Sequence, residues 1–374
     1  MVSLQFVVKI FLSFFALSWT GLVIKGESCK GTRSFTLQSR CENGVIVNTL
    51  NKTTENLLTD QVSTLIIPIL YTVVVVVGLP ANILALWVLL TKVKRLPGTI
   101  LLINLAIADV LLLLFLPFKI VYYFMGSRWI FGEAMCRVVT AAFYGNMYGS
   151  ILCLMFISID RYISLVHPFS AKSFRSKKLA ISVSIMTWAI AVAAMVPFVA
   201  IKQSYHINNT SMITCHDALP ADLKTNLFAY YFTSLTAFGF ILPFLSILIC
   251  YVSIICSLSR QEKPFARTVK ICAIVLTVFM VCYIPSHVIL LLHYNRDQVL
   301  QDSRLYRPYM VSLVLSTFNS SIDPFLYLYV SDDFRVKVRE ALRRVTARGS
   351  LQGSERTEQS VSYKTKSEEL SLKA

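Results

Sequence analysis

The chain has 374 residues, of which 55% are hydrophobic and only 15% are charged, and its formal net charge is +16. A soluble domain carries about 25% charged residues, and here the hydrophobic residues form long runs of the length that a spanning helix needs. The composition therefore excludes an ordinary soluble protein and predicts a membrane protein. In that setting the basic residues are explained by a membrane surface, and no nucleic acid partner is expected.

Residues 1–26 are typical of a secretory signal peptide. Their apolar stretch is fairly short, and Ala16, Ser18 and Gly21 are small residues that offer cleavage points. The alternative is an additional spanning helix. A signal peptide would place the next segment, residues 27–63, outside the cell as an extracellular tail.

Within this tail, Arg33 directly precedes Ser34 and Phe35 in the stretch KGTRSFTLQSRC. Nothing in the stretch predicts a packed core, so Arg33 is expected to be exposed. Cys29 and Cys41 lie on either side of Ser34 and Phe35 and could form a disulfide, because disulfides persist outside the cell.

Seven long apolar segments follow, and each is long enough to cross a bilayer with some tilt. They cover residues 64–90, 99–124, 134–164, 178–201, 227–257, 266–293 and 306–330. Membrane β-strands are short and alternate in hydrophobicity, which these segments do not. The predicted fold is an all-α membrane protein, a seven-transmembrane helix bundle over residues 64–330, with a short amphipathic helix after the seventh span.

The connections between the spans differ in charge. Those after the first, third and fifth spans, and the segment after the seventh, carry far more Lys and Arg than the others. Since cytoplasmic loops are enriched in Lys and Arg, the chain is predicted to be a multi-pass membrane protein with an extracellular N-terminus. Glycosylation sequons begin at Asn51, Asn208 and Asn209, all in segments predicted to lie outside.

Ionisable residues within spans are costly and are therefore candidates for function. Asp109 lies in the second predicted span and Asp323 in the seventh, and Asp160-Arg161-Tyr162 closes the third. Prolines interrupt four spans, at Pro197, Pro243, Pro285 and Pro324, where each would kink its helix.

With these motifs in this order, the chain resembles the rhodopsin-like, class A G-protein-coupled receptors over about residues 60–345. The matching motifs are GLPAN with Asn82, NLAIAD with Asp109, Cys136, DRY at 160–162, Trp188, Pro243 with Tyr251, FMVCYIP at 279–285 and DPFLY at 323–327. The sequence departs from the usual motifs at Tyr283, where the family usually has Trp, and at Asp323, where it usually has Asn.

The resemblance implies a G-protein switch in which Arg161 pairs with Asp160 at rest and, once released, reaches into a cavity that admits a G-protein helix. The switch residues would be Asp160, Arg161, Tyr162, Tyr251, Phe279, Tyr283, Pro285, Asp323, Pro324 and Tyr327. It also implies a disulfide between Cys136 and Cys215. The sequence contains no catalytic triad, phosphate loop or zinc motif, so no enzymatic activity is expected.

A carboxylate pair is predicted at mid-membrane. Two buried carboxylates cannot both be charged without a cation or a proton. The family resemblance implies a sodium ion held by Asp109, Ser150, Asn319, Ser320 and Asp323, and the alternative is a shared proton. No other cofactor is expected.

Three further strings, FYGNMYGSI, ITCHDALP and CYIPSHVILLLHY, are similar to the protease-activated receptors. A nucleotide receptor is less consistent, because Leu290 stands one turn after His287, where a basic residue would hold phosphate. The resemblance implies that a trypsin-like serine protease cuts between Arg33 and Ser34. Thr32 before the cut and the few acidic residues after it weakly disfavour thrombin.

The new N-terminus would then act as a tethered ligand. Its residues would be Ser34, Phe35, Thr36, Leu37, Gln38 and Ser39. Residues that would bind it are His216, Asp217, Tyr230, Tyr231, His287, Tyr306 and Tyr309, with Asp217 as the partner of the new α-ammonium group.

The remaining partners follow from the same resemblance. They are heterotrimeric G proteins of the Gq, G12/13 and Gi classes, and receptor kinases and arrestin at the polar tail, residues 346–374. Residues 331–345 would form the amphipathic helix on the lipid bilayer. The first alternative is a class A receptor for a soluble peptide or lipid, with Arg33 incidental. The second is a transporter. Internal repeats would favour a transporter, but this sequence shows none.

Overall fold

The computed structural model describes residues 32–33, 37–42, 45–50, 52–169, 175–207, 212–216, 225–259, 266–295, 305–330 and 334–340. The predicted signal peptide, Cys29, Ser34 to Thr36, the sequons at Asn51, Asn208 and Asn209, Asp217 and residues 346–374 lie outside these residues.

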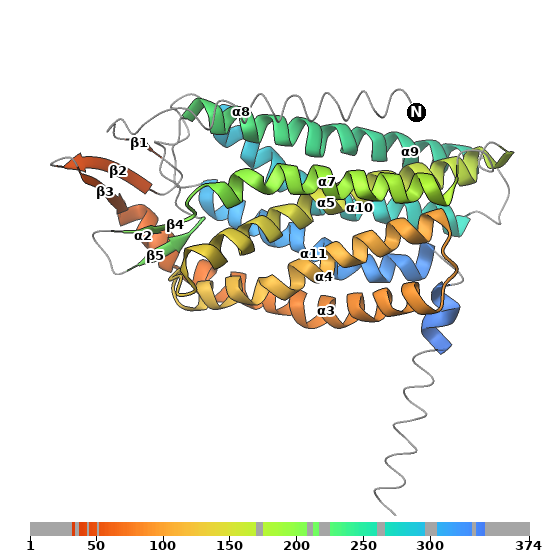
Figure 1. The fold of residues 1–374 in the computed structure, drawn as a ribbon, viewed down its shortest axis with the longest axis horizontal. Helices are drawn as coiled ribbons and strands as arrows, with labels where there is room; N and C mark the ends of the chain where they lie inside the picture. Colours follow the sequence, from red (N-terminus) through yellow and green to blue (C-terminus); the bar gives the residue numbers. More distant parts are fainter. Residues whose placement is uncertain are drawn as a thin grey trace, which may run out of the picture.

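Long helices run side by side along the length of the molecule (Figure 1). In chain order they are α3 (Ile67–Thr91), α4 (Pro97–Phe124), α5 (Gly132–Val166), α7 (Lys177–Ala200), α8 (Thr225–Thr236) continued by α9 (Leu242–Ser259), α10 (Ala266–Asn295) and α11 (Tyr306–Val330). The prediction of an all-α helix bundle is confirmed.

Within the described residues, six helical segments are long and apolar enough to cross a membrane. The seventh, α11, has 25 residues and is more polar, because Asn319 and Asp323 lie among several Ser and Thr residues along it. On the outside of the bundle, Val76, Ile185 and Ile249 are 65%, 66% and 65% exposed. Large apolar side chains so open to the surroundings are expected where a bundle faces lipid.

Local sequence explains where several helices begin and bend. Pro97 begins α4, a position where its missing N–H costs nothing. The Ser176 hydroxyl accepts a hydrogen bond of 3.1 Å from the Leu179 N–H and so caps α7. A π-helical turn, η2 (Ala237–Ile241), precedes Pro243 and joins α8 to α9, and such turns occur where the regular hydrogen-bond ladder is broken.

A short β-hairpin covers one end of the bundle, which we call the disulfide end. Its strands, β4 (Ser204–His206) and β5 (Ile213–Cys215), pair antiparallel with Ser204 opposite Cys215. The predicted disulfide between Cys136 and Cys215 is confirmed, with Cα atoms 5.7 Å apart, and it attaches β5 to the start of α5. Glu133 holds β4 as well, because its carboxylate accepts hydrogen bonds from the N–H groups of Gln203 and Ser204 at 2.9 and 2.8 Å.

The N-terminal tail contains strands that the sequence analysis did not predict. β1 (Thr32–Arg33), β2 (Leu37–Glu42) and β3 (Val45–Leu50) form an antiparallel sheet in the order β1-β2-β3. The helix α2 (Lys52–Thr59) and the π-helical turn η1 (Val62–Ile66) connect the sheet to α3. A sequence signal for the hairpin was available in Asn43-Gly44, which is typical of a two-residue hairpin turn, followed by the β-branched run Val45 to Val47.

At the opposite end, residues 334–340 form a short helix after α11. Phe334 and Val338 are both buried, and the Phe334 ring lies edge-on to Tyr327 with centroids 6.1 Å apart. Lys337 pairs with Glu340 at 3.3 Å on the exposed side. The described residues therefore have the two faces of an amphipathic helix, and the apolar face packs on the bundle.

Candidate functional site

A chain of hydrogen-bonding side chains crosses the bundle at the disulfide end. The His216 Nδ1 atom lies 2.8 Å from Gln203 Oε1, and Nε2 lies 3.0 Å from the Tyr144 hydroxyl. That hydroxyl lies 3.0 Å from the hydroxyl of Tyr309. The chain joins the β4–β5 hairpin to α5 and α11, so it connects three elements that are far apart in the sequence.

The protonation state of His216 follows from its hydrogen-bond partners and its surroundings. Burial, together with the positive charge of Lys119, lowers the pKa of His216 from its usual 6.5 to about 3, so the ring is neutral at physiological pH. Gln203 donates its amide N–H to the Phe198 carbonyl at 3.1 Å, which leaves Oε1 facing His216 as an acceptor. The His216 Nδ1 atom therefore carries the proton, and Nε2 accepts from Tyr144.

Aromatic rings surround the chain. Tyr144 stacks on Phe198 with ring centroids 4.9 Å apart and planes 4° from parallel, and His216 meets Phe198 edge-on at 5.6 Å. Tyr231 meets the same Phe198 ring at 5.9 Å and donates its hydroxyl to the Ala194 carbonyl. The result is an apolar wall with a few fixed polar groups, which is the usual character of a ligand site.

The structure separates the predicted ligand residues into two groups. His216, Tyr231 and Tyr309 share the cluster around Tyr144 and Phe198, and Tyr306 is buried in the first turn of α11. Asp217 and the side chain of Tyr230 lie outside the described residues. The roles of all these residues in ligand binding remain predictions.

His287 belongs to a deeper group. Its Nδ1 atom lies 2.8 Å from the Tyr283 carbonyl, and its ring stacks on Phe240 with centroids 4.0 Å apart. Phe279 lies 5.1 Å from the Tyr283 ring and continues the column. The predicted switch residues Phe279 and Tyr283 are therefore in contact with each other, and they continue the group of rings that contains His287 and Phe240.

Tyr144, Phe198 and Gln203 were missed as site residues by the sequence analysis. Tyr144 was visible in the string FYGNMYGSI, but nothing in the sequence placed it under His216. The disulfide and the Glu133 contacts bring the hairpin over α5, and these are long-range contacts.

The two predicted core carboxylates are both fully buried. Asp109 Oδ1 accepts from the Asn146 amide at 3.2 Å and from the Ser150 hydroxyl at 3.5 Å. Asp323 Oδ2 accepts from the Asn319 amide at 2.8 Å. Asn146 also accepts from Ser320 at 3.4 Å, so it joins α4, α5 and α11, and it is a further residue that the sequence analysis missed.

These residues fit a small hard cation. Asp109 Oδ2 and Asp323 Oδ1 are buried and have no hydrogen-bond partner within the described part of the chain. Buried carboxylate oxygens without partners, close to hydroxyl and amide oxygens, are the donors that hard cations take. Asp109, Ser150, Asn319, Ser320 and Asp323 would hold the sodium ion, whose charge would compensate the two carboxylates.

At the end opposite the hairpin, the structure differs from the expected pairing of Asp160 with Arg161. Asp160 instead accepts two hydrogen bonds from Arg175, at 2.7 and 3.0 Å. Adjacent residues on a helix do not face each other, whereas the planar fork of Arg175 matches a carboxylate. The buried Nε of Arg161 has no hydrogen-bond partner among the described residues.

Two neighbouring features complete this end. A Cβ at Gly98 would lie 2.9 Å from Asp160 Oδ2, so glycine allows the start of α4 to approach the pair. The Tyr162 hydroxyl lies 3.0 Å from His167 Nε2. Of the other predicted switch residues, Tyr251 and Tyr327 are buried, and Pro285 and Pro324 lie within α10 and α11.

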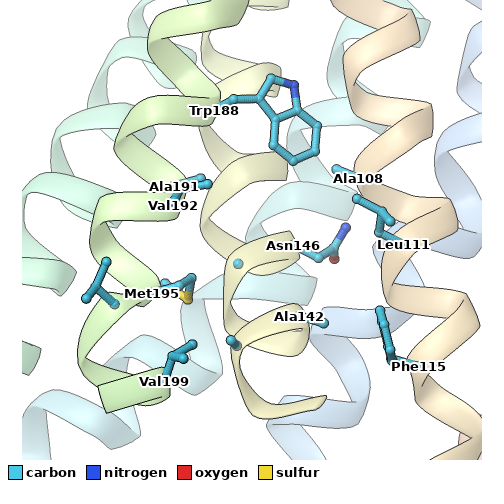
Figure 2. A pocket seen from close by; sticks show the side chains of 13 residues that line it. Ala108, Leu111, Phe115, Ala142, Asn146, Trp188, Ala191, Val192, Met195 and Val199 are labelled. Carbon is cyan, nitrogen blue, oxygen red and sulfur yellow. The ribbon is translucent and has the colours of Figure 1, made fainter. Parts of the chain in front are cut away.

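An apolar groove of about 370 Å³ lies between α4, α5 and α7 (Figure 2), and it borders the site of the two core carboxylates through Asn146. Its lining includes Ala108, Ala142 and Met195, with Trp188 and Asn146 as the residues that carry polar atoms. Val192 and Val199 on its rim are 62% and 47% exposed, so the groove opens on the outer surface of the bundle. It contains none of the predicted ligand residues.

The predicted cleavage site lies in the N-terminal sheet. Arg33 in β1 pairs with Gln38 in β2, and Thr32 pairs with Ser39. On its other side, β2 pairs with β3, so that Leu37 lies opposite Leu50. The described part of the predicted ligand, Leu37 to Ser39, is therefore the first half of the middle strand, and it would have to leave both neighbouring strands before it could bind elsewhere.

Comparison with known proteins agrees with this architecture. Residues 81–327 match the family model of the 7 transmembrane receptor (rhodopsin family). The chain is 42% identical to proteinase-activated receptor 4 of Homo sapiens over 84% of each chain. It is 38% identical to proteinase-activated receptor 3 of Rattus norvegicus, over 79% of this chain and 81% of the relative. With proteinase-activated receptor 2 of Homo sapiens the identity is 38%, over 80% of this chain and 78% of the relative. The chain therefore belongs to the proteinase-activated receptors within the rhodopsin family of seven-transmembrane receptors.

Proposed function

We propose that this chain is a plasma-membrane G-protein-coupled receptor that a trypsin-like serine protease activates by cutting between Arg33 and Ser34. The cut converts the Ser34 amide into a free α-ammonium group, which does not exist in the intact chain. Residues Ser34 to Ser39 then act as the tethered ligand.

The observation that carries this proposal is the location of the tail. The sheet β1-β2-β3 and α2 lie at the same end of the bundle as the β4–β5 hairpin and its cluster around His216 (Figure 1). A ligand released from β2 therefore starts at the end of the bundle that carries the aromatic cluster. Phe35 and Leu37 supply apolar side chains for it, and Asp217, next to His216, is the proposed partner of the new ammonium group.

Orientation follows from this assignment. The disulfide end faces the outside, which agrees with the excess of Lys and Arg in the connections at the other end. Heterotrimeric G proteins, of the Gq, G12/13 and Gi classes, bind at the end that carries Arg161. Receptor kinases and arrestin act on the Ser- and Thr-rich residues 346–374.

Calcium signalling in transfected cells tests the proposal. Arg33→Ala should abolish the response to a panel of trypsin-like proteases but preserve the response to the free peptide Ser-Phe-Thr-Leu-Gln-Ser. Arg33→Lys is the matched control, because trypsin-like enzymes accept Lys as well as Arg, and it should keep the protease response. If Arg33→Ala responds to protease like the wild type, cleavage occurs elsewhere.

A further inference from the structure

We propose that α2 and Asp60 form a clamp that fixes the tail to the disulfide end and so delivers the tethered ligand on a short link. The clamp consists of Leu58, Asp60 and their contacts Ser127 and Arg307. The inference rests on the proposed function, because a clamp of this kind affects only a ligand that is carried on the chain.

The first contact of the clamp is apolar. Leu58 is 0% exposed and belongs to the main hydrophobic core of the bundle, against which Leu57 and Val62 also pack. With eight residues, α2 is too short to be stable as an isolated helix in water. Its burial at Leu58 therefore explains why this part of the tail is helical at all.

Two polar contacts hold the same segment from different sides. Ser127, between α4 and α5, donates its hydroxyl to the Leu58 carbonyl at 3.0 Å and is itself fully buried. Its φ of 61° is uncommon for a residue other than glycine, so this position is held by its surroundings. Arg307, in the first turn of α11, pairs with the Asp60 carboxylate.

The clamp also orders the chain that follows it. The other carboxylate oxygen of Asp60 accepts from the Gln61 N–H at 2.8 Å, and the Ser63 hydroxyl donates to the Leu57 carbonyl at 2.7 Å. The tail is therefore attached to the bundle well before α3 begins at Ile67. The ligand strand β2 is stored next to the clamp, since Leu37 pairs with Leu50, two residues before α2.

The clamp shortens the link between ligand and bundle. With α2 docked, the 12 residues 40–51 separate Ser39 from the first anchored helix. Without it, the 27 residues 40–66 separate Ser39 from α3. Effective concentration falls roughly as the −3/2 power of link length, so loss of the clamp should lower it about threefold.

The test measures signal per cut receptor in the full-length chain. Leu58→Ala and Arg307→Gln remove the apolar and the ionic contact, and Asn56→Ala, on the exposed side of α2, is the matched control. The number of cut receptors is counted by size on a reducing gel. To keep ligand occupancy below saturation, each variant is also made with the weakened ligand Phe35→Leu.

On that background, Leu58→Ala should lose about threefold in signal per cut receptor, Arg307→Gln should lose less because its ion pair is partly exposed, and Asn56→Ala should lose none. The dose response to free peptide should be the same in all of them. An equal loss with free peptide would mean that these residues act in the ligand pocket, and an unchanged signal per cut receptor would mean that no clamp operates. Either result overturns the inference.

Hydrogen exchange separates this inference from the proposed function. In the uncut wild type, the amides of residues 56–59, which follow the first four N–H groups of α2, should exchange slowly, and in Leu58→Ala they should exchange fast. Fast exchange in the wild type would overturn the clamp, whether or not the receptor responds to protease. A receptor whose α2 is protected but which never responds to protease would instead refute the proposed function.

Discussion

Acidification should destabilise this receptor through one residue of the disulfide end, His216. Its ring is neutral in the fold, because burial and the positive charge of Lys119 lower its pKa to about 3. In the unfolded chain the same ring binds a proton near its usual pKa of 6.5. Folded stability should therefore be greatest above pH 6.5 and should fall steadily as the pH drops from there towards 3.

The size of the loss in folding stability follows from the difference between the pKa of His216 in the unfolded chain and its pKa in the fold. Each pH unit below 6.5 costs about 1.36 kcal/mol while the folded ring stays neutral. At about pH 5 the loss is therefore roughly 2 kcal/mol. The physical event is proton competition for Nε2, which in the fold accepts from the Tyr144 hydroxyl and would have to become a donor.

Thermal melting of the purified receptor in detergent, at about pH 7.5 and about pH 5, measures this loss. His216→Gln should flatten the pH dependence by the equivalent of about 2 kcal/mol relative to wild type. His206→Gln, an exposed position on the same hairpin, should leave the wild-type dependence unchanged. If His216→Gln and wild type lose the same stability on acidification, the buried neutral ring is not the cause.

Two further predictions concern the buried charges. Replacing a large inert cation by sodium at constant ionic strength should lower the affinity of the wild type for agonist peptide, about fivefold if the coupling is of ordinary size, and Asp109→Asn should remove the effect. Wild-type affinity that is indifferent to sodium would favour a proton shared by Asp109 and Asp323. Arg175→Gln should lower the thermal stability of the receptor by about 1–3 kcal/mol, because it leaves the Asp160 carboxylate without its partner. Asp160→Asn in the same chain should recover most of that loss, and a double variant as unstable as the single one would contradict the reasoning.

Much of the fold could be predicted from sequence because its signals are local. A run of apolar residues indicates a spanning helix, and nearly every predicted span agrees with its helix to within a few residues. The N-terminal sheet was missed although Asn43-Gly44 is a hairpin signal, since the tail was interpreted as exposed chain. The disulfide was predictable only through family resemblance, because the sequence does not say which cysteines meet.

The candidate site was predictable only in part. His216 and Tyr309 were identified as candidates, but their connection through Tyr144 depends on a hairpin that folds over α5. The pairing of Asp160 with Arg175 was missed because Arg175 looked like one of several basic residues in a loop. Asn146 looked like an ordinary polar residue in a span until its contacts with Asp109 and Ser320 became visible.

The sequence by itself determined that this chain is a membrane-spanning helix bundle of a recognisable receptor family, because apolar runs and short motifs are properties of neighbouring residues. Only the tertiary structure decided which polar side chains meet, and therefore which of them are charged and which are fixed by a partner. The clamp is the clearest case: Leu58 meets Ser127 across 69 positions and Asp60 meets Arg307 across 247. Contacts over such separations depend on how the whole bundle closes, and no local pattern encodes that closure.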